Sequence, residues 1–177
     1  AEPLAFTLAL AMPRVDLVFD GIDTCAAIEL NGHAIASVDN MYRTWRFSVK
    51  DALKPGRNTL RVVIASPIRA GAQAQQAHEH ESCLGPRCKE PRVYLRKMPC
   101  SFGWDWGIKL PMSGIWKAVR LEAWGPARIA TVWHETKLCG DQRARLHGWI
   151  TFERTAPCPV AVHMQLRGPD GTVYDLD

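Results

Sequence analysis

The stretch Ala26-Ala27-Ile28-Glu29-Leu30-Asn31-Gly32 decides the fold of this chain. In an extended backbone, Ala26, Ile28 and Leu30 lie on one side, and Glu29 lies on the other. This period of two is typical of a β-strand with one buried face. Asn-Gly is the dipeptide that best fits the two-residue turn of a right-twisted hairpin. The stretch therefore predicts a strand that returns on itself within an antiparallel sheet.

The same alternation continues on both sides of this stretch. Apolar residues recur at every second position in segments 4–10, 15–20, 45–50, 60–64, 93–95 and 115–124. Residues 1–12 are apolar but alternate and lack a basic leader, so they predict a strand rather than a signal peptide. Residues 66–91 lose the alternation, and only 70–81 predict a short helix. We expect an all-β chain with one long connection, which in compact domains is usually functional or mobile.

Gly125-Pro126 predicts a domain boundary. Beyond it come three more alternating segments, near residues 129–138, 145–153 and 160–167. A turn at residues 168–171 follows, and then a strand that opens at Thr172. An immunoglobulin-like sandwich takes about 100 residues and about seven strands. We therefore expect one β-sandwich at residues 1–125 and the first part of an immunoglobulin-like β-sandwich at 126–177.

Composition and charge disfavour several classes of protein. The chain has 177 residues, 22 basic and 18 acidic side chains and a net charge of +4, without the basic stripe of a nucleic-acid-binding surface. No apolar run approaches the roughly 20 residues that cross a bilayer. The asparagines begin no N-x-Ser/Thr acceptor, and the six cysteines follow no disulfide spacing. The last two features favour a reducing, cytoplasmic compartment.

Signatures of self-sufficient catalysis are also missing. The sequence contains no G-x-S-x-G, P-loop, H-E-x-x-H or G-x-G-x-x-G, and nothing indicates the pair of carboxylates that hydrolyses a glycoside. Residues 78–83 and Cys88 include zinc-binding side chains, but their spacing matches no familiar finger and their surroundings favour an exposed loop. We expect no catalytic residue, metal or cofactor in this chain.

The densest chemical signal is the segment 101–107, with Trp116 a short distance beyond it. Three tryptophans and an aspartate stand within residues 104–116. An indole offers a flat apolar surface to the C–H face of a sugar ring, and a carboxylate accepts hydrogen bonds from neighbouring hydroxyls. This pattern makes Trp104 and Asp105 candidate sugar contacts. On composition alone, the alternative that the tryptophans are core and that Asp105 caps a turn stays open and is the more common arrangement.

The motifs around this cluster closely resemble the β-mannosidase branch of glycoside hydrolase family two. The matching segments are 17–24, 30–32, 39–41, 45–47, 95–97, 102–107 and 113–117. They follow one another in the family's order, whereas beyond Pro126 the resemblance rests on position and pattern only. Ile108 departs from the family, where proline usually follows the second glycine. The resemblance also implies that the family's first strands precede Ala1.

The resemblance implies a jelly-roll sandwich, then an immunoglobulin-like domain, then a barrel with two catalytic glutamates that this chain does not contain. The chain would be the non-catalytic amino-terminal portion of an exo-acting retaining β-mannosidase. Its loop would help to close the pocket for a terminal β-linked mannose, with Asp105 on hydroxyls remote from the scissile bond and Trp104 as a wall. We infer in addition that Arg96 and Trp106 hold this loop in place.

Two alternatives stay open at this point. One is a free-standing carbohydrate-binding module. The other is the same domain of a related β-galactosidase, β-glucuronidase or exo-β-glucosaminidase, because sugar specificity also depends on barrel residues. The resemblance adds a lysosome to the possible compartments. The missing barrel and the terminal mannose are the expected partners, without nucleic acid or membrane.

Overall fold

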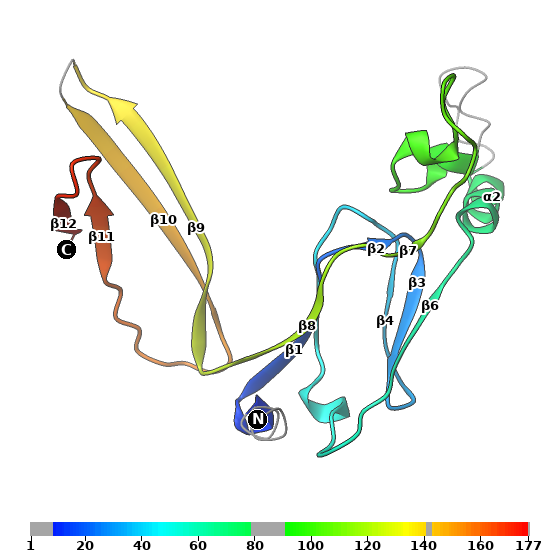
Figure 1. Cartoon of the computed structure of the whole chain (residues 1–177). Helices are drawn as coiled ribbons and strands as arrows, with labels where there is room; N and C mark the ends of the chain where they lie inside the picture. The colour runs from blue at the N-terminus through cyan, green and yellow to red at the C-terminus, as the bar shows by residue number, and fades with distance from the viewer. Residues whose placement is uncertain (1–8, 79–90, 141–142, 177) are drawn as a thin grey trace. The chain divides into compact units, whose positions relative to one another are not determined.

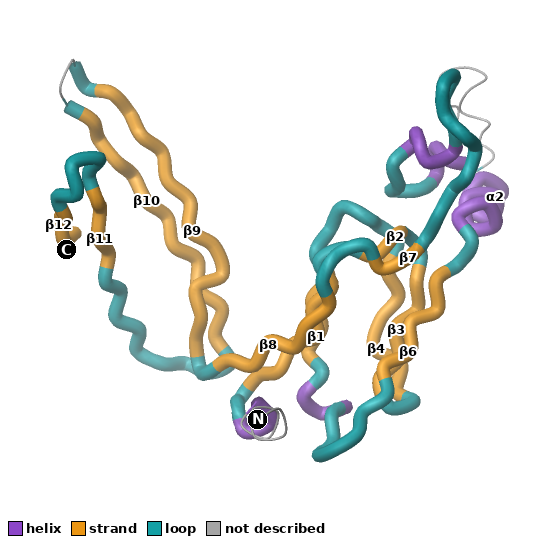
Figure 2. The backbone as a smooth tube through the Cα atoms, in the orientation of Figure 1, coloured by secondary structure: helices purple, strands orange, loops and turns teal. Residues whose placement is uncertain are grey.

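The computed structural model describes residues 9–78, 91–140 and 143–176. The chain divides into two compact units, Ala1–Ala123 and Trp124–Asp177 (Figure 1). Regular structure is mostly strand, with a helix α2 (Pro67–Ala77) and short 3-10 helices (Figure 2). The all-β fold class predicted from the sequence is confirmed. The division lies next to Gly125-Pro126, and the assignment of two domains stays a prediction.

The first unit is a sandwich of two three-stranded sheets. One sheet has the order β5 (Trp45–Ser48), β1 (Arg14–Phe19), β8 (Val119–Trp124). The other has the order β4 (His33–Val38), β3 (Ala26–Leu30), β6 (Leu60–Ile64). A short antiparallel pair joins β2 (Ile22–Asp23) to β7 (Gly114–Ile115). Buried Leu17 and Phe19 of one sheet and Ile28 and Leu30 of the other share one core. Full burial of such a side chain contributes about 1.5–3 kcal/mol.

The predicted hairpin at Asn31-Gly32 is confirmed. Asn31 has φ 54° and Gly32 has φ 84°, the left-handed pair that a two-residue turn requires, and Leu30 lies opposite His33. The Asn31 amide also donates to the Ala52 carbonyl at 2.8 Å and to the Asn58 side-chain oxygen at 2.7 Å. This turn therefore contributes both the strand reversal and a tie to the turn that precedes β6.

Strand β1 is buried on both faces, whereas the alternation predicts one. On the face away from the core, Asp16 is buried and its carboxylate accepts from Arg14 at 2.6 Å and from Arg46 of β5 at 3.5 Å. Arg46 also pairs with Glu122 of β8, which accepts from Arg120 at 2.7 Å. These long side chains cover the outer face of the sheet. The hydrogen bond from Arg46 holds the pKa of Glu122 below its ordinary value; burial opposes this shift and Arg120 reinforces it.

Two strand predictions are wrong where packing overrides alternation. Residues 9–11, within the predicted strand at the start of the chain, are helical, and the Met12 N–H donates to the Ala9 carbonyl at 3.1 Å. Alanine and leucine favour such a turn, and Pro13 then ends it. Most of the predicted strand at 93–95 instead belongs to a 3-10 helix, η3 (Pro91–Tyr94). It packs so tightly on α2 that a Cβ at Gly71 would meet the Pro91 carbonyl at 2.6 Å.

The predicted strand at 115–124 is split into β7 and β8. The break falls after Ile115, where the Trp116 N–H donates to the Gly21 carbonyl at 3.2 Å and its indole N–H donates to the Met41 carbonyl at 3.3 Å. The first bond still follows the register of the β2–β7 pair, whereas the indole bond holds the Trp116 side chain against Met41. The register shifts by one residue after Trp116, where the Asp20 N–H donates to the Ala118 carbonyl at 3.0 Å, and this shift separates β7 from β8. The predicted helix begins at Pro67, earlier than expected, since proline favours the first helical position.

In the described part of the second unit, the strands form two antiparallel pairs. Strand β9 (Ala127–Leu138) pairs with β10 (Ala144–Arg154), and β11 (Met164–Arg167) pairs with β12 (Val173–Leu176). Trp133 lies opposite Trp149, and their ring centroids are 4.2 Å apart. The predicted turn at 168–171 is confirmed, with the Gly168 N–H donating to the Thr172 carbonyl at 2.7 Å. The immunoglobulin-like assignment of this unit stays a prediction.

Candidate functional site

Trp104 and Asp105 lie on a loop of residues 98–113 between η3 and β7, called here the tryptophan loop. It opens with a 3-10 helix, η4 (Pro99–Phe102), and then reverses at Gly103. Gly103 has φ 110°, a conformation that side chains rarely adopt, and a Cβ there would collide with Lys109. Beyond it the Gly107 N–H donates to the Trp104 carbonyl at 3.2 Å, which closes a tight turn with Asp105 and Trp106 at its tip.

The side chains of this turn are exposed within the described part of the chain. Trp104 is 54% exposed and Trp106 is 84% exposed, so neither belongs to the core of the first unit. The Asp105 carboxylate accepts from the Trp106 N–H at 3.1 Å, and no other described residue donates to it. Asp105 thus caps its own turn through one oxygen, while the remaining acceptor positions point to no described partner. A ligand hydroxyl needs this kind of accessible acceptor.

A buried lysine ties the two ends of the tryptophan loop together. Lys97 precedes the loop, and its side chain is 1% exposed. Its ammonium donates to the Met112 carbonyl near the other end of the loop at 2.8 Å, and it pairs with the carboxylate of Asp23 in β2. A buried charge requires such partners, because an unpaired one is strongly destabilising. The base of the loop is therefore fastened to the sandwich.

Met41 forms a second tie at the same base. Its N–H donates to the Arg96 carbonyl at 3.0 Å, and its sulfur accepts from the Met98 N–H at 3.1 Å. Its own carbonyl accepts from the Trp116 indole, and the neighbouring Asn40 carbonyl accepts from the Trp45 indole at 3.0 Å. Met41 is buried, so these bonds are shielded from water. Segments on both sides of the tryptophan loop converge on this one residue.

Arg96 and Trp106, predicted to support the loop, contribute differently from Lys97 and Met41. Arg96 takes part through its backbone, which bridges to Asn40, and its exposed side chain has no partner among the described residues. The Trp106 indole is largely exposed. Their supporting role stays a prediction. Sequence reasoning gave Lys97 no role, because its partner Asp23 lies 74 positions away and a lone lysine carries no local signal.

The candidate zinc segment falls mostly outside the described residues, since 79–90 are not described. Within residues 9–78, 91–140 and 143–176, no cluster of His, Cys, Asp and Glu could hold a metal ion. The free cysteines there are Cys25, Cys100, Cys139 and Cys158. Burial, together with nearby Asp39 and Asp23, raises the pKa of the Cys25 thiol, which keeps it in its unreactive form. No helix in the same described ranges is long and apolar enough to span a bilayer.

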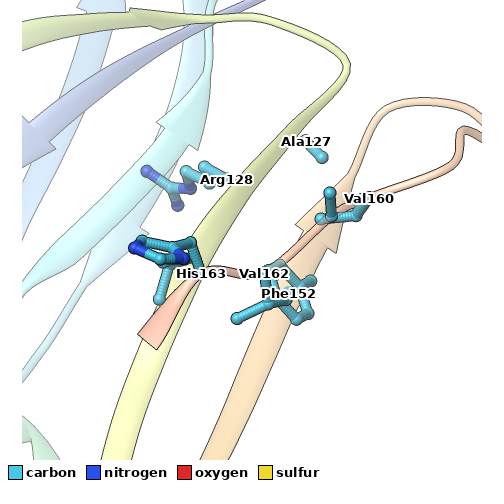
Figure 3. A pocket seen from close by; sticks show the side chains of 8 residues that line it. Ala127, Arg128, Phe152, Val160, Val162 and His163 are labelled. Carbon is cyan, nitrogen blue, oxygen red and sulfur yellow. The ribbon is translucent and has the colours of Figure 1, made fainter. Parts of the chain in front are cut away.

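The second unit contains a hollow of about 210 Å³ (Figure 3). Its walls include Phe152, Val160 and Val162, with Arg128 and His163 on one side. The Arg128 guanidinium is already engaged, because it donates to Glu153 at 2.8 Å and lies 4.7 Å from the ring centre of Trp124. The hollow contains none of the predicted site residues.

The sequence matches the family described as "Glycosyl hydrolase 2 galactose-binding domain-like" over residues 5–117. The chain belongs to this family of glycosyl hydrolase domains. Within it, the resemblance to β-mannosidases seen in the sequence is confirmed. The chain is 40% identical to the β-mannosidase of Bos taurus over 123 residues, which cover 66% of this chain and 14% of that protein. It is 36% identical to β-mannosidase B of Emericella nidulans over 132 residues, which cover 73% of this chain and 16% of that protein.

Solved structures give the same result. The β-D-mannosidase of Dictyoglomus thermophilum matches with a TM-score of 0.74 and 38% identity over 83% of this chain. A β-glycosidase of Bacteroides vulgatus, with a TM-score of 0.58 and 21% identity, shares the fold. The chain spans 14%, 16% and 18% of the three mannosidases named above, so their activity belongs to proteins several times longer.

Proposed function

We propose that this chain is the non-catalytic amino-terminal portion of an exo-acting retaining β-mannosidase, and that Trp104 and Asp105 contact the terminal mannose. One observation carries the proposal. The exposed Trp104 and the accessible Asp105 carboxylate stand side by side on a loop whose base is fastened by the buried Lys97. Mannose is proposed as the sugar because the chain is similar to three proteins named as β-mannosidases.

The proposed division of labour follows from the chemistry of glycoside hydrolysis. A retaining enzyme uses two carboxyl groups about 5–5.5 Å apart, and the longer polypeptide would provide them. Asp105 transfers no proton. It would accept hydrogen bonds from hydroxyls on the far side of the ring, while the Trp104 indole would cover a C–H face. Contacts remote from the reacting centre can orient and distort the sugar, and a pocket closed at that end admits only a chain terminus.

The test is the Asp105→Ala variant of the complete enzyme, assayed with aryl β-mannoside, β-glucoside and β-galactoside. We expect kcat/KM for the mannoside to fall by roughly 100-fold or more, because charge-assisted hydrogen bonds to the ring are lost. The matched control is Asp51→Ala in the exposed 3-10 helix η1 (Lys50–Ala52), which should behave as wild type. Unchanged turnover in a folded Asp105→Ala enzyme would make the tryptophan loop a scaffold. Preferred hydrolysis of another glycoside would assign a related branch.

A free-standing carbohydrate-binding module is the second candidate. The strong exposure of Trp106 favours it, because such modules present aromatic rings to their ligands. The mass of the native gene product separates the two candidates. A sandwich, a second sandwich, a barrel and trailing domains sum to about 90–100 kDa, whereas a module would be several times smaller.

A further inference from the structure

We propose that Lys97 is a positioning residue for the sugar contact made by Asp105, an inference that rests on the proposed function of the tryptophan loop. Lys97 does not lie at the tip of the loop, and no role follows for it from its place in the sequence. Its ammonium instead sits where the loop leaves the sandwich and where it returns. This one atom joins the two loop ends by charge, beside the uncharged tie that Met41 makes.

The contacts of Lys97 define both ends of the loop. Residue 97 immediately precedes the tryptophan loop, and the Met112 carbonyl that accepts from its ammonium lies one residue before the loop ends. Gly114, two positions beyond Met112, lies opposite Asp23 in the β2–β7 pair. Asp23 is also the ion-pair partner of Lys97. The ammonium, the carboxylate and the strand that receives the loop thus form one closed set of contacts.

Burial makes this set of contacts rigid. The Lys97 side chain is 1% exposed, and the Asp23 side chain is 13% exposed. In such surroundings an ammonium cannot exchange its protein partners for water without a large loss of free energy. The second Asp23 oxygen is engaged as well, since it accepts from the Thr24 hydroxyl. Both partners of the pair are therefore held in one arrangement.

The rest of the loop has few other constraints within the described residues. The Gly107–Trp104 and Trp106–Asp105 bonds shape the tip but connect it only to itself. Between the tip and the sandwich stand exposed side chains, including Ile108, Leu110 and Met112. The direction of the Asp105 carboxylate consequently depends on how the ends are fastened. A displacement of about 1 Å at a substrate contact can reduce turnover by roughly 100-fold.

The experiment is a double-mutant cycle in the complete enzyme between Lys97→Met and Asp105→Ala. Methionine keeps most of the lysine stem and removes the ammonium. We expect Lys97→Met alone to lower kcat/KM for aryl β-mannoside by roughly 10–100-fold. In the Asp105→Ala background the same change should lower it by less than about threefold, because the contact that Lys97 positions is already gone.

The control is Lys50→Met. The Lys50 ammonium also donates to a methionine carbonyl, that of Met12 at 2.6 Å, but none of its contacts belongs to the tryptophan loop. It should leave kcat/KM unchanged. If Lys97→Met is not recovered as a folded enzyme, Asp23→Asn replaces it in the cycle, since asparagine keeps the shape and removes the charge that pairs with Lys97.

The outcomes are distinguishable. Strong non-additivity with Asp105→Ala supports the proposal. Equal losses from Lys97→Met in both backgrounds, with a large effect of Asp105→Ala alone, would reduce Lys97 to a stabilising residue and leave the proposed function intact. No effect of Asp105→Ala would overturn the proposed function, and the positioning role with it.

Discussion

Exposed tryptophans stand close to a partner group both in the tryptophan loop of the first unit and in the β9–β10 pair of the second. Trp104 is 54% exposed and Trp133 is 57% exposed, so exposure does not distinguish them. Their surroundings do. Trp133 packs against Trp149 directly across the β9–β10 ladder, with centroids 4.2 Å apart and the rings tilted by 38°. Trp104 lies next to the accessible carboxylate of Asp105, on a loop without regular secondary structure at its tip. The buried Lys97–Asp23 ion pair holds the base of this loop.

The difference shows what separates a candidate binding surface from an ordinary aromatic pair. Two indoles that face each other across a ladder cover part of each other's apolar surface. Such pairs contribute about 0.5–1.5 kcal/mol beyond the area they bury. An indole beside the Asp105 carboxylate leaves both a flat face and an acceptor without described partners. The loop is also fastened through Lys97 to Asp23, which lies 74 positions away in the chain. Irregular backbone that requires such support is typical of functional sites.

Among variants that leave Trp104 and Asp105 in place, Gly103→Ala has the largest expected effect. Because Gly103 has φ 110° and a Cβ would collide with Lys109, alanine must distort the reversal that presents Trp104. We expect kcat/KM of the complete enzyme for aryl β-mannoside to fall by roughly 100-fold. Gly107→Ala is the control, since its Cβ would meet Trp104 at an ordinary 3.6 Å. Equal losses from both variants would show that the geometry of the reversal is not what matters.

A smaller effect, and on stability rather than turnover, is expected from Trp133→Ala. Urea unfolding should show a lower free energy of unfolding for Trp133→Ala and for Trp149→Ala. A double-mutant cycle should give a coupling of about 0.5–1.5 kcal/mol between them, because the two rings contact each other. Mannoside kcat/KM should stay within about twofold of wild type. A tenfold loss of kcat/KM would place the hairpin tryptophans in the sugar site and remove the contrast with the tryptophan loop.

The smallest expected effect is on the pH dependence of stability. It concerns Glu122 in the β5–β1–β8 sheet. Hydrogen bonding to Arg46 lowers the pKa of Glu122 in the folded state. This pairing therefore stabilises the fold above the ordinary glutamate pKa of about 4.3, and the contribution is lost as pH falls through the lower folded-state value. Melting temperatures at pH 7 and pH 3 should differ more for wild type than for Glu122→Gln, by a few degrees at most. An equal change in melting temperature for Glu122→Gln and wild type would contradict the pairing.

The fold was predictable wherever local pattern and local structure agree. Asn31-Gly32 specifies its turn within two residues, so the hairpin of β3 and β4 follows from sequence. The alternation of residues 129–138 and 145–153 likewise predicts the long β9–β10 pair. Residues 93–95 alternate too, but most of them belong to a 3-10 helix. This helix begins at Pro91, which packs on Gly71 of α2. That contact joins distant segments and leaves no local signature.

The candidate site divides in the same way. The residue types of Trp104 and Asp105 suggest a sugar contact, and their exposure is consistent with one. The fastening of the loop could not be predicted. Lys97 and Asp23 are 74 positions apart, and Met41 connects to Trp116 across a similar separation of 75. Pairings of this kind depend on the assembled sandwich rather than on any neighbouring residue.

The burial of the Lys97–Asp23 pair also determines how the loop responds to dissolved salt. On the surface of the same unit, Arg61 and Glu29 pair at 3.0 Å with side chains that are 65% and 33% exposed, so mobile ions can surround and screen them. Counterions have no comparable access to Lys97, whose side chain is 1% exposed. Rising ionic strength therefore weakens the sheet's surface pairs while it leaves the anchorage of the tryptophan loop almost unchanged. The loop keeps its geometry across dilute and concentrated media alike.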